Sequence, residues 1–150
     1  RKRGMFEEAV GCWKQSLPIA TEIGAKLSVI ISHCNAGNVL ALMEGREKDA
    51  LDNLKQALIL SQQIGSAPIT LELLVGIMHL RIRASRLEEA AELAGLVSSH
   101  PAYNAEIKEY LDPIFTELGN KMEEKLLSGS VSRGGTGNLD DTVKGIVEKE

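Results

Sequence analysis

Aromatic residues make up only 3% of this chain of 150 residues. A core with so few rings must be filled by Leu, Ile, Val and Ala. This argues against β-sandwiches and β-barrels, because their strands favour aromatic and β-branched residues. Cysteine is scarce as well, since Cys12 and Cys34 are the only two. They cannot form a disulfide scaffold, and reduced thiols indicate a cytoplasmic protein. The composition therefore favours an all-α, cytoplasmic protein.

Basic residues are not in excess, because 17 Lys and Arg stand against 21 Asp and Glu, for a net charge of −4. We therefore expect no direct nucleic-acid partner. No apolar run approaches the roughly 20 residues that cross a bilayer, and no signal peptide opens the chain, so no membrane partner is expected either. Position 1 is Arg rather than Met, from which we expect a fragment or a trimmed form of a longer chain.

A six-residue unit occurs three times. It reads Gly-Met-Phe-Glu-Glu-Ala at 4–9, Gly-Arg-Glu-Lys-Asp-Ala at 45–50 and Ser-Arg-Leu-Glu-Glu-Ala at 85–90. Its final alanines, Ala9, Ala50 and Ala90, are 41 and 40 residues apart. A fixed period with the same turn residues is the signature of stacked repeats. The sequence therefore predicts an α-solenoid, a stack of helix hairpins with a period of 40–41 residues.

Apolar residues within each period follow helical spacing, as Ala50, Leu54, Ala57 and Leu58 do in steps of three and four. The pattern predicts a helix over 5–23, a hairpin of 26–44 with 47–64, and a hairpin of 67–84 with 86–99. Pro18 predicts a kink near 14–18, because proline removes a hydrogen bond of the helix. Small residues are expected where helix axes approach closely: Gly37, Ala50, Ala57, Gly76, Ala90 and Ala94.

The period ends at about residue 100. Pro101 then predicts a helix over 102–118, bent or interrupted at Pro113 with Asp112 as a cap for its second half. A short amphipathic stretch follows at 122–127. The Gly- and Ser-rich segment 128–137 predicts a flexible linker, and Asn138 can cap a last helix over 139–148. We therefore expect repeats over 1–100 and a C-terminal helical cap over 101–150.

Residues 35–45, followed by Ala50, Leu54 and Ala57, resemble the tetratricopeptide repeat. The period is longer than the 34 residues of the plain repeat, so the resemblance implies a lengthened variant. It implies a right-handed solenoid of antiparallel hairpins whose first helices line a concave groove for peptides or small ligands. Carried over to this chain, the groove residues would be Asn38, Ala41, Met78 and Arg81.

A second resemblance covers Arg86 to Pro101. This stretch is similar to the C-terminal end of bacterial signalling proteins of the maltose-activator type, in which an ATPase module precedes tetratricopeptide-like repeats. The resemblance implies the sensor arm of a larger signal-transducing or transcription-regulating protein, with ATPase and output domains upstream in the same polypeptide. The implied ligand is a protein, a peptide or a small effector. The Gly-rich piece 129–137 departs from the pattern.

No residue combination predicts catalysis, a metal site or a cofactor. His33 and Cys34 are neighbours on a helix and point roughly 100° apart, so they are interpreted as buried filler together with Cys12. The glycines of 133–138 lack the preceding strand and the Lys of a phosphate loop. The paired carboxylates at 7–8, 88–89 and 123–124 lie early in predicted helices, where acidic groups complement the helix dipole. The sequence therefore predicts an interaction module and not an enzyme.

The alternative hypothesis is an assembly element with no ligand of its own. The chain begins at the second helix of a repeat, so Phe6, Ala9 and Trp13 would lack the neighbour that covers them in a complete repeat. An uncovered apolar face tends to self-associate. This hypothesis predicts a homodimer through the N-terminal end.

Overall fold

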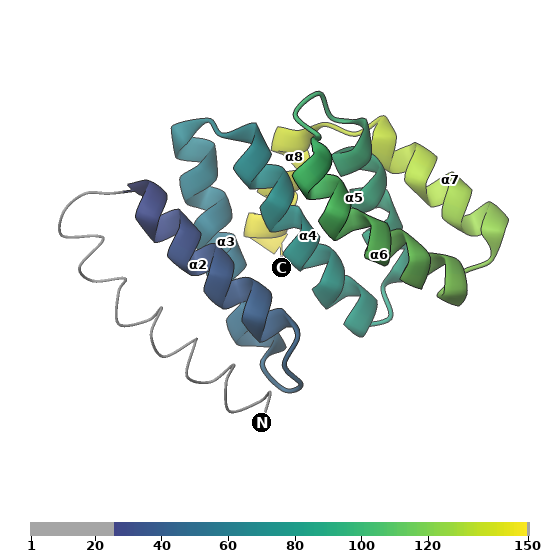
Figure 1. The fold of residues 1–150 in the computed structure, drawn as a ribbon, viewed down its shortest axis with the longest axis horizontal. Coiled ribbons are helices and arrows are strands. Elements are labelled where there is room, and N and C mark those ends of the chain that lie inside the picture. The colour runs from purple at the N-terminus through teal and green to yellow at the C-terminus, as the bar shows by residue number, and fades with distance from the viewer. Residues whose placement is uncertain (1–25, 150) are drawn as a thin grey trace. The chain divides into compact units, whose positions relative to one another are not determined.

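The computed structural model describes residues 26–149 of the chain (Figure 1). These residues form seven helices and contain no strand, so the expected all-α class is confirmed for this part. The helices are α2 (Lys26–Ala41), α3 (Glu47–Ile64), α4 (Ala67–Arg83), α5 (Leu87–Ser99), α6 (Ala105–Lys121), α7 (Glu124–Gly135) and α8 (Leu139–Lys149). The expectations for helix 5–23, for the kink near Pro18 and for Phe6, Ala9 and Trp13 lie outside the described residues.

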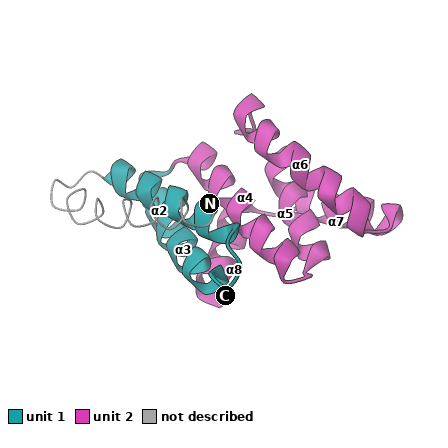
Figure 2. Ribbon diagram, turned by 60° about the horizontal axis from the view of Figure 1, so that its bottom comes forward, with its two compact units in different colours: residues 1–65 teal, residues 66–150 magenta. Residues whose placement is uncertain are grey.

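The chain divides into two compact units, residues 1–65 and 66–150 (Figure 2). The division lies at Gly65, where α3 ends in the left-handed conformation (φ 68°) that is common at helix C-termini. The expected boundary between repeats and a C-terminal cap at residue 100 lies inside the second unit, where α6 packs against both α4 and α5, and it stays a prediction.

In the first unit, α2 and α3 lie side by side and are joined by a short turn (Figure 1). Their contact is close because Gly37 has no side chain. A Cβ there would lie 2.7 Å from Cγ of the fully buried Leu54. Cys34 is buried, which confirms its interpretation as filler, and Nδ1 of His33 lies 2.9 Å from Oδ1 of Asn53. The predicted close approach at Gly37 is confirmed.

In the second unit, α4 and α5 form the next hairpin, α6 packs on both, and α7 packs on α5. Its core is aliphatic, as the shortage of rings predicted. The fully buried large side chains of this unit are Leu71, Leu73, Leu74, Ile77, Met78, Leu111, Ile114 and Leu118. No helix of the part of the chain that the structure describes is long and apolar enough to span a bilayer.

The prediction of a flexible linker over 128–137 is wrong, since most of this segment belongs to α7. Composition predicted a linker because Gly and Ser are poor helix formers. In the structure their small size allows α7 to lie directly against α5. The following cap is confirmed, because Asn138 Oδ1 accepts a hydrogen bond from the backbone N–H of Asp141 at 3.0 Å at the start of α8.

The helix expected over 102–118 is present as α6, Ala105–Lys121, and the interruption expected as one alternative at Pro113 is not seen. α6 begins at Ala105 because Asn104 caps it, accepting a hydrogen bond from the N–H of Ile107 at 2.9 Å. The helix then continues through Pro113 to Lys121 without interruption, so Asp112 does not cap a second half. Asp112 instead accepts a hydrogen bond from Nζ of Lys108 at 2.6 Å.

Candidate binding site

The four predicted groove residues fall in different units and differ in exposure. Ala41 and Met78 are 1% and 0% exposed, so neither offers a side chain to a ligand. Asn38 is half-buried, and its amide donates a hydrogen bond to Sγ of Cys34, one turn earlier in α2, at 3.4 Å. Arg81 is also half-buried. Asn38 and Arg81 are therefore the two predicted groove residues that are partly exposed.

Arg81 is turned toward the second helix of its own hairpin. Its guanidinium Nη1 donates a hydrogen bond to the backbone carbonyl oxygen of Glu89 in α5, at 3.2 Å. This contact holds the end of α4 to the start of α5. It gives Arg81 a structural role in addition to the predicted one in ligand binding.

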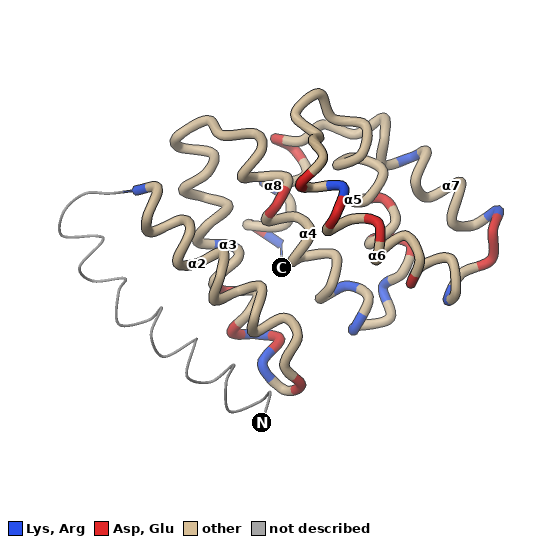
Figure 3. The backbone as a smooth tube through the Cα atoms, in the orientation of Figure 1, with Lys and Arg blue, Asp and Glu red and all other residues tan. Residues whose placement is uncertain are grey.

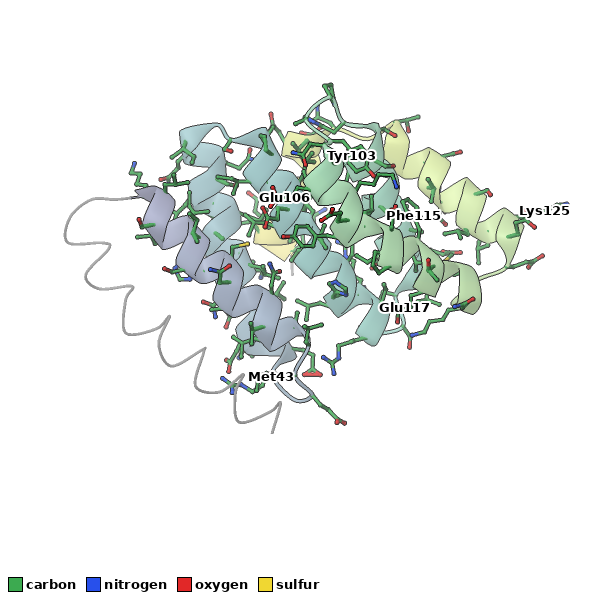
Figure 4. All side chains as sticks on the ribbon, viewed as in Figure 1. Met43, Tyr103, Glu106, Phe115, Glu117 and Lys125 are labelled. Carbon is green, nitrogen blue, oxygen red and sulfur yellow. The ribbon has the colours of Figure 1, made fainter. Side chains whose placement is uncertain are left out.

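A different part of α4 carries titratable groups that face α6. Glu72 and His79 are seven residues apart and so lie on one side of α4, while Glu106 and Glu117 occupy α6, which packs beside it (Figure 4). We call these four residues the α4/α6 face. Nothing in the sequence distinguishes them, because each is an isolated polar residue in an amphipathic helix until the two helices are brought together.

The two half-buried groups of the α4/α6 face have shifted pKa values. Burial raises the pKa of the Glu72 carboxyl, and the negative charge of Glu106 raises it further. Burial lowers the pKa of the His79 imidazole; the charge of Glu117 opposes this shift, and that of Arg83 adds to it. His79 is therefore predominantly neutral at pH 7, with one nitrogen available as a donor and the other as an acceptor.

A cavity of about 370 Å³ opens where α5 and α7 begin. Its volume lies within the range of about 300–1,000 Å³ that is common for ligand sites. We call it the α5/α7 pocket. It is lined by the turn before α5, the first turn of α5, the end of α6 and the start of α7: Ser85, Arg86, Leu87, Glu88, Glu89, Lys121, Met122, Glu123 and Leu126.

The pocket combines apolar surface with charges of both signs. Leu87, Met122 and Leu126 supply apolar surface, and Leu126 is 41% exposed. Arg86 is paired with Glu89, and Nζ of Lys121 lies 2.8 Å from Oε2 of Glu117. Figure 3 shows acidic and basic residues close together where α6 ends and α7 begins. Such a lining suits a peptide that carries both apolar and polar side chains.

Sequence reasoning missed this pocket for a definite reason. It interpreted the carboxylates at 88–89 and 123–124 as first-turn residues that complement helix dipoles, and Glu88, Glu89 and Glu124 do lie in the first turns of α5 and α7. The sequence alone does not show that the first turns of α5 and α7 lie next to each other, because this depends on α7 being a helix and packing on α5.

Within residues 26–149 no group of three His, Cys, Asp or Glu side chains is arranged to hold a metal ion. No protein-family model, no curated protein and no solved structure matches the chain.

Proposed function

We propose that this chain is a non-catalytic interaction and sensor module, a tetratricopeptide-like α-solenoid that belongs to a larger bacterial signalling or transcription-regulating protein of the cytoplasm. Its ligand would be a protein or peptide, or a small effector. Binding would bias an attached switch only to the extent that the ligand has unequal affinity for the two states of that switch.

One observation carries the solenoid part of the proposal: the turn inside each described hairpin is built in the same way, 40 residues apart. Gly45 and Ser85 both have positive φ, 82° and 61°. The next residue in each copy, Arg46 or Arg86, pairs through Nε with an acidic side chain three residues later. The same two arginines supply the carbonyl oxygens that accept the N–H groups of Ala50 and Ala90, at 2.9 and 3.1 Å.

This similarity supports a true structural repeat because it involves backbone conformation as well as residue type. Ala50 and Ala90 are both 0% exposed, as expected for equivalent positions in a helix contact. Repeats of this kind bury a continuous core by stacking and offer their surfaces to partners. The proposal extends the local equivalence of two hairpins to a superhelical stack.

The alternative function, an assembly element, is favoured by a different observation. Three large apolar side chains of the first unit are strongly exposed: Leu27 at 50%, Ile31 at 49% and Leu42 at 55%. Exposed apolar surface of this kind often marks a contact between proteins. The alternative retains the expected homodimer through Phe6, Ala9 and Trp13, and light scattering that shows a monomer at high concentration would contradict it.

The ligand-binding proposal is tested by selecting peptides from a displayed random library on the immobilised chain. We expect an enriched family of peptides that bind in isothermal titration calorimetry. Arg81→Glu tests the predicted groove, and Leu126→Glu tests the α5/α7 pocket. Lys125→Glu is the matched control, because Lys125 is exposed, lies next to Leu126 and is not part of the pocket lining.

We expect the selected peptides to lose at least tenfold in affinity for one of the two test variants, which corresponds to about 1.4 kcal/mol. The control should bind as the wild type does. Unchanged binding to Arg81→Glu would remove the groove assignment. Failure to enrich any peptide would contradict peptide binding and leave the assembly function as the stronger hypothesis.

A further inference from the structure

Helix α7 has a sequence that does not favour a helix by itself. Its twelve residues, EKLLSGSVSRGG, include three glycines and three serines. Glycine loses more backbone freedom in a helix than any other residue, and serine competes for backbone hydrogen bonds. Helices of this length are marginal in water even when they are rich in alanine. The helical state of α7 therefore depends on its contact with the rest of the second unit.

That contact is made with α5, and it is a contact between backbones. A Cβ at Gly134 would overlap the carbonyl oxygen of Glu92, and a Cβ at Gly95 would overlap the carbonyl oxygen of Val131. Both positions must be glycine for the two helices to lie so close. The geometry explains why α7 contains residues that are unfavourable for its own helix.

Little apolar side-chain surface accompanies this close contact. The buried residues of α7 are Ser130 and Gly134, neither of which carries a large apolar side chain, and Leu126 is 41% exposed. By contrast, α5 and α6 bury several Leu, Ile or Val side chains each. Elements with few buried apolar groups open locally at a lower free energy than the core does. Thus α7 is expected to open before its neighbours.

The same helix provides one side of the α5/α7 pocket. Leu126 lies in α7, Met122 and Glu123 lie immediately before it, and Leu87 and Glu88 on α5 are also part of the lining. Separation of α7 from α5 would therefore take the pocket apart. A ligand that contacts both helices would bind the docked state more tightly and would shift the equilibrium toward it.

We propose that α7 is a conditional helix, which is folded only while it is docked on α5. Docking of α7 forms the α5/α7 pocket, and undocking dismantles it. This goes beyond the proposed function, because it concerns the chain itself and would hold equally for an assembly element without a ligand. The physical basis is the combination of weak intrinsic helicity, backbone contact through Gly95 and Gly134, and shared residues between helix and pocket.

Hydrogen–deuterium exchange of the full chain tests the proposal without a ligand. We expect backbone amides of 124–135 to exchange at least tenfold faster than those of 87–99, because they open by undocking while α5 stays folded. Equal protection of the two segments would overturn the proposal, since α7 would then open only together with its neighbour.

Two glycine substitutions in α7 separate docking from intrinsic helicity. Gly134→Ala should abolish docking through the overlap with Glu92, so that exchange in 124–135 becomes at least tenfold faster while 67–83 stays protected. Gly129→Ala should have the opposite effect, at least a threefold slowing. A Cβ there meets only Arg133 Nη1, at 3.7 Å, and alanine favours the helix.

The matched control is Gly119→Ala in α6, where a Cβ meets no atom within 4 Å. It should leave exchange in 124–135 unchanged. If Gly134→Ala unfolds the whole unit, Gly129→Ala still tests the proposal. If α7 did not open and close locally, a more favourable helix propensity in α7 would not slow amide exchange in 124–135. Unchanged exchange in Gly129→Ala would therefore overturn the proposal.

Discussion

Individual residues with positive φ determine where the described hairpins turn. Gly45 and Gly65 adopt this conformation at no steric cost, because they have no Cβ. Ser85 adopts it as well, with φ 61°, and is the only non-glycine residue among the described ones to do so. For a residue with a side chain the left-handed region costs roughly 1–2 kcal/mol. Ser85 therefore carries strain that its counterpart Gly45 does not.

An exchange of residue type between these two turns tests the point. Ser85→Gly should raise the free energy of unfolding by roughly 0.5–1 kcal/mol, since relief of strain exceeds the added freedom of glycine in the unfolded chain. Gly45→Ser should lower it by a similar amount, and urea denaturation measures both. Ser85→Gly with unchanged or lower stability would show that the serine side chain makes a compensating contact.

At the scale of the element, Pro113 is accommodated inside α6 because of its position on the helix. The proline is exposed, whereas its neighbours Leu111 and Ile114 are buried. Its missing N–H would have bonded to the carbonyl oxygen of Glu109, which is itself an exposed residue. The helix therefore continues through the proline, although the lost hydrogen bond and the clash of the proline ring destabilise it.

Pro113→Ala should consequently stabilise the protein by about 2 kcal/mol. Restoring the helix hydrogen bond and removing the ring clash are worth about 3 kcal/mol, and part of this is offset because alanine gives the unfolded chain more freedom. Thermal unfolding followed by circular dichroism measures the change. A lower melting temperature for Pro113→Ala would mean that the proline makes a packing contact that favours the folded state.

Prediction from the sequence succeeded where an element is defined by its own residues. Helix 47–64 was predicted with the bounds of α3, because an apolar stripe fills it and Gly65 ends it. Prediction failed at α7, where local composition favours a linker and a contact with Gly95, about 40 residues away, favours a helix. The α5/α7 pocket could not be predicted for the same reason, since its walls come from these two helices.

At the scale of the whole molecule, two titratable groups make the stability of the second unit depend on pH in opposing ways. The raised pKa of Glu72 means that the folded state binds the proton of this carboxyl more tightly than the unfolded state does. This contribution is complete below the ordinary value of 4.5 and is lost as pH rises through the raised pKa. The lowered pKa of His79 gives a contribution that is complete above 6.5 and is lost as pH falls through the lowered pKa.

Between 4.5 and 6.5, the ordinary pKa values of the two groups, these contributions therefore change with pH in opposite directions. Each neutral replacement should uncover the other group. In Glu72→Gln the free energy of unfolding should therefore rise with pH more steeply than in the wild type over this window. In His79→Gln it should rise with pH less steeply than in the wild type, or fall.

Urea denaturation at several pH values measures the slopes, and Glu106→Gln separates the causes. The charge of Glu106 raises the pKa of Glu72 only in addition to burial, so this third variant should weaken the Glu72 contribution without removing it. Slope changes of the same sign, relative to the wild type, in Glu72→Gln and His79→Gln would contradict the argument. Slope changes of opposite sign would show that burial of these two groups gives the second unit two opposing responses to pH.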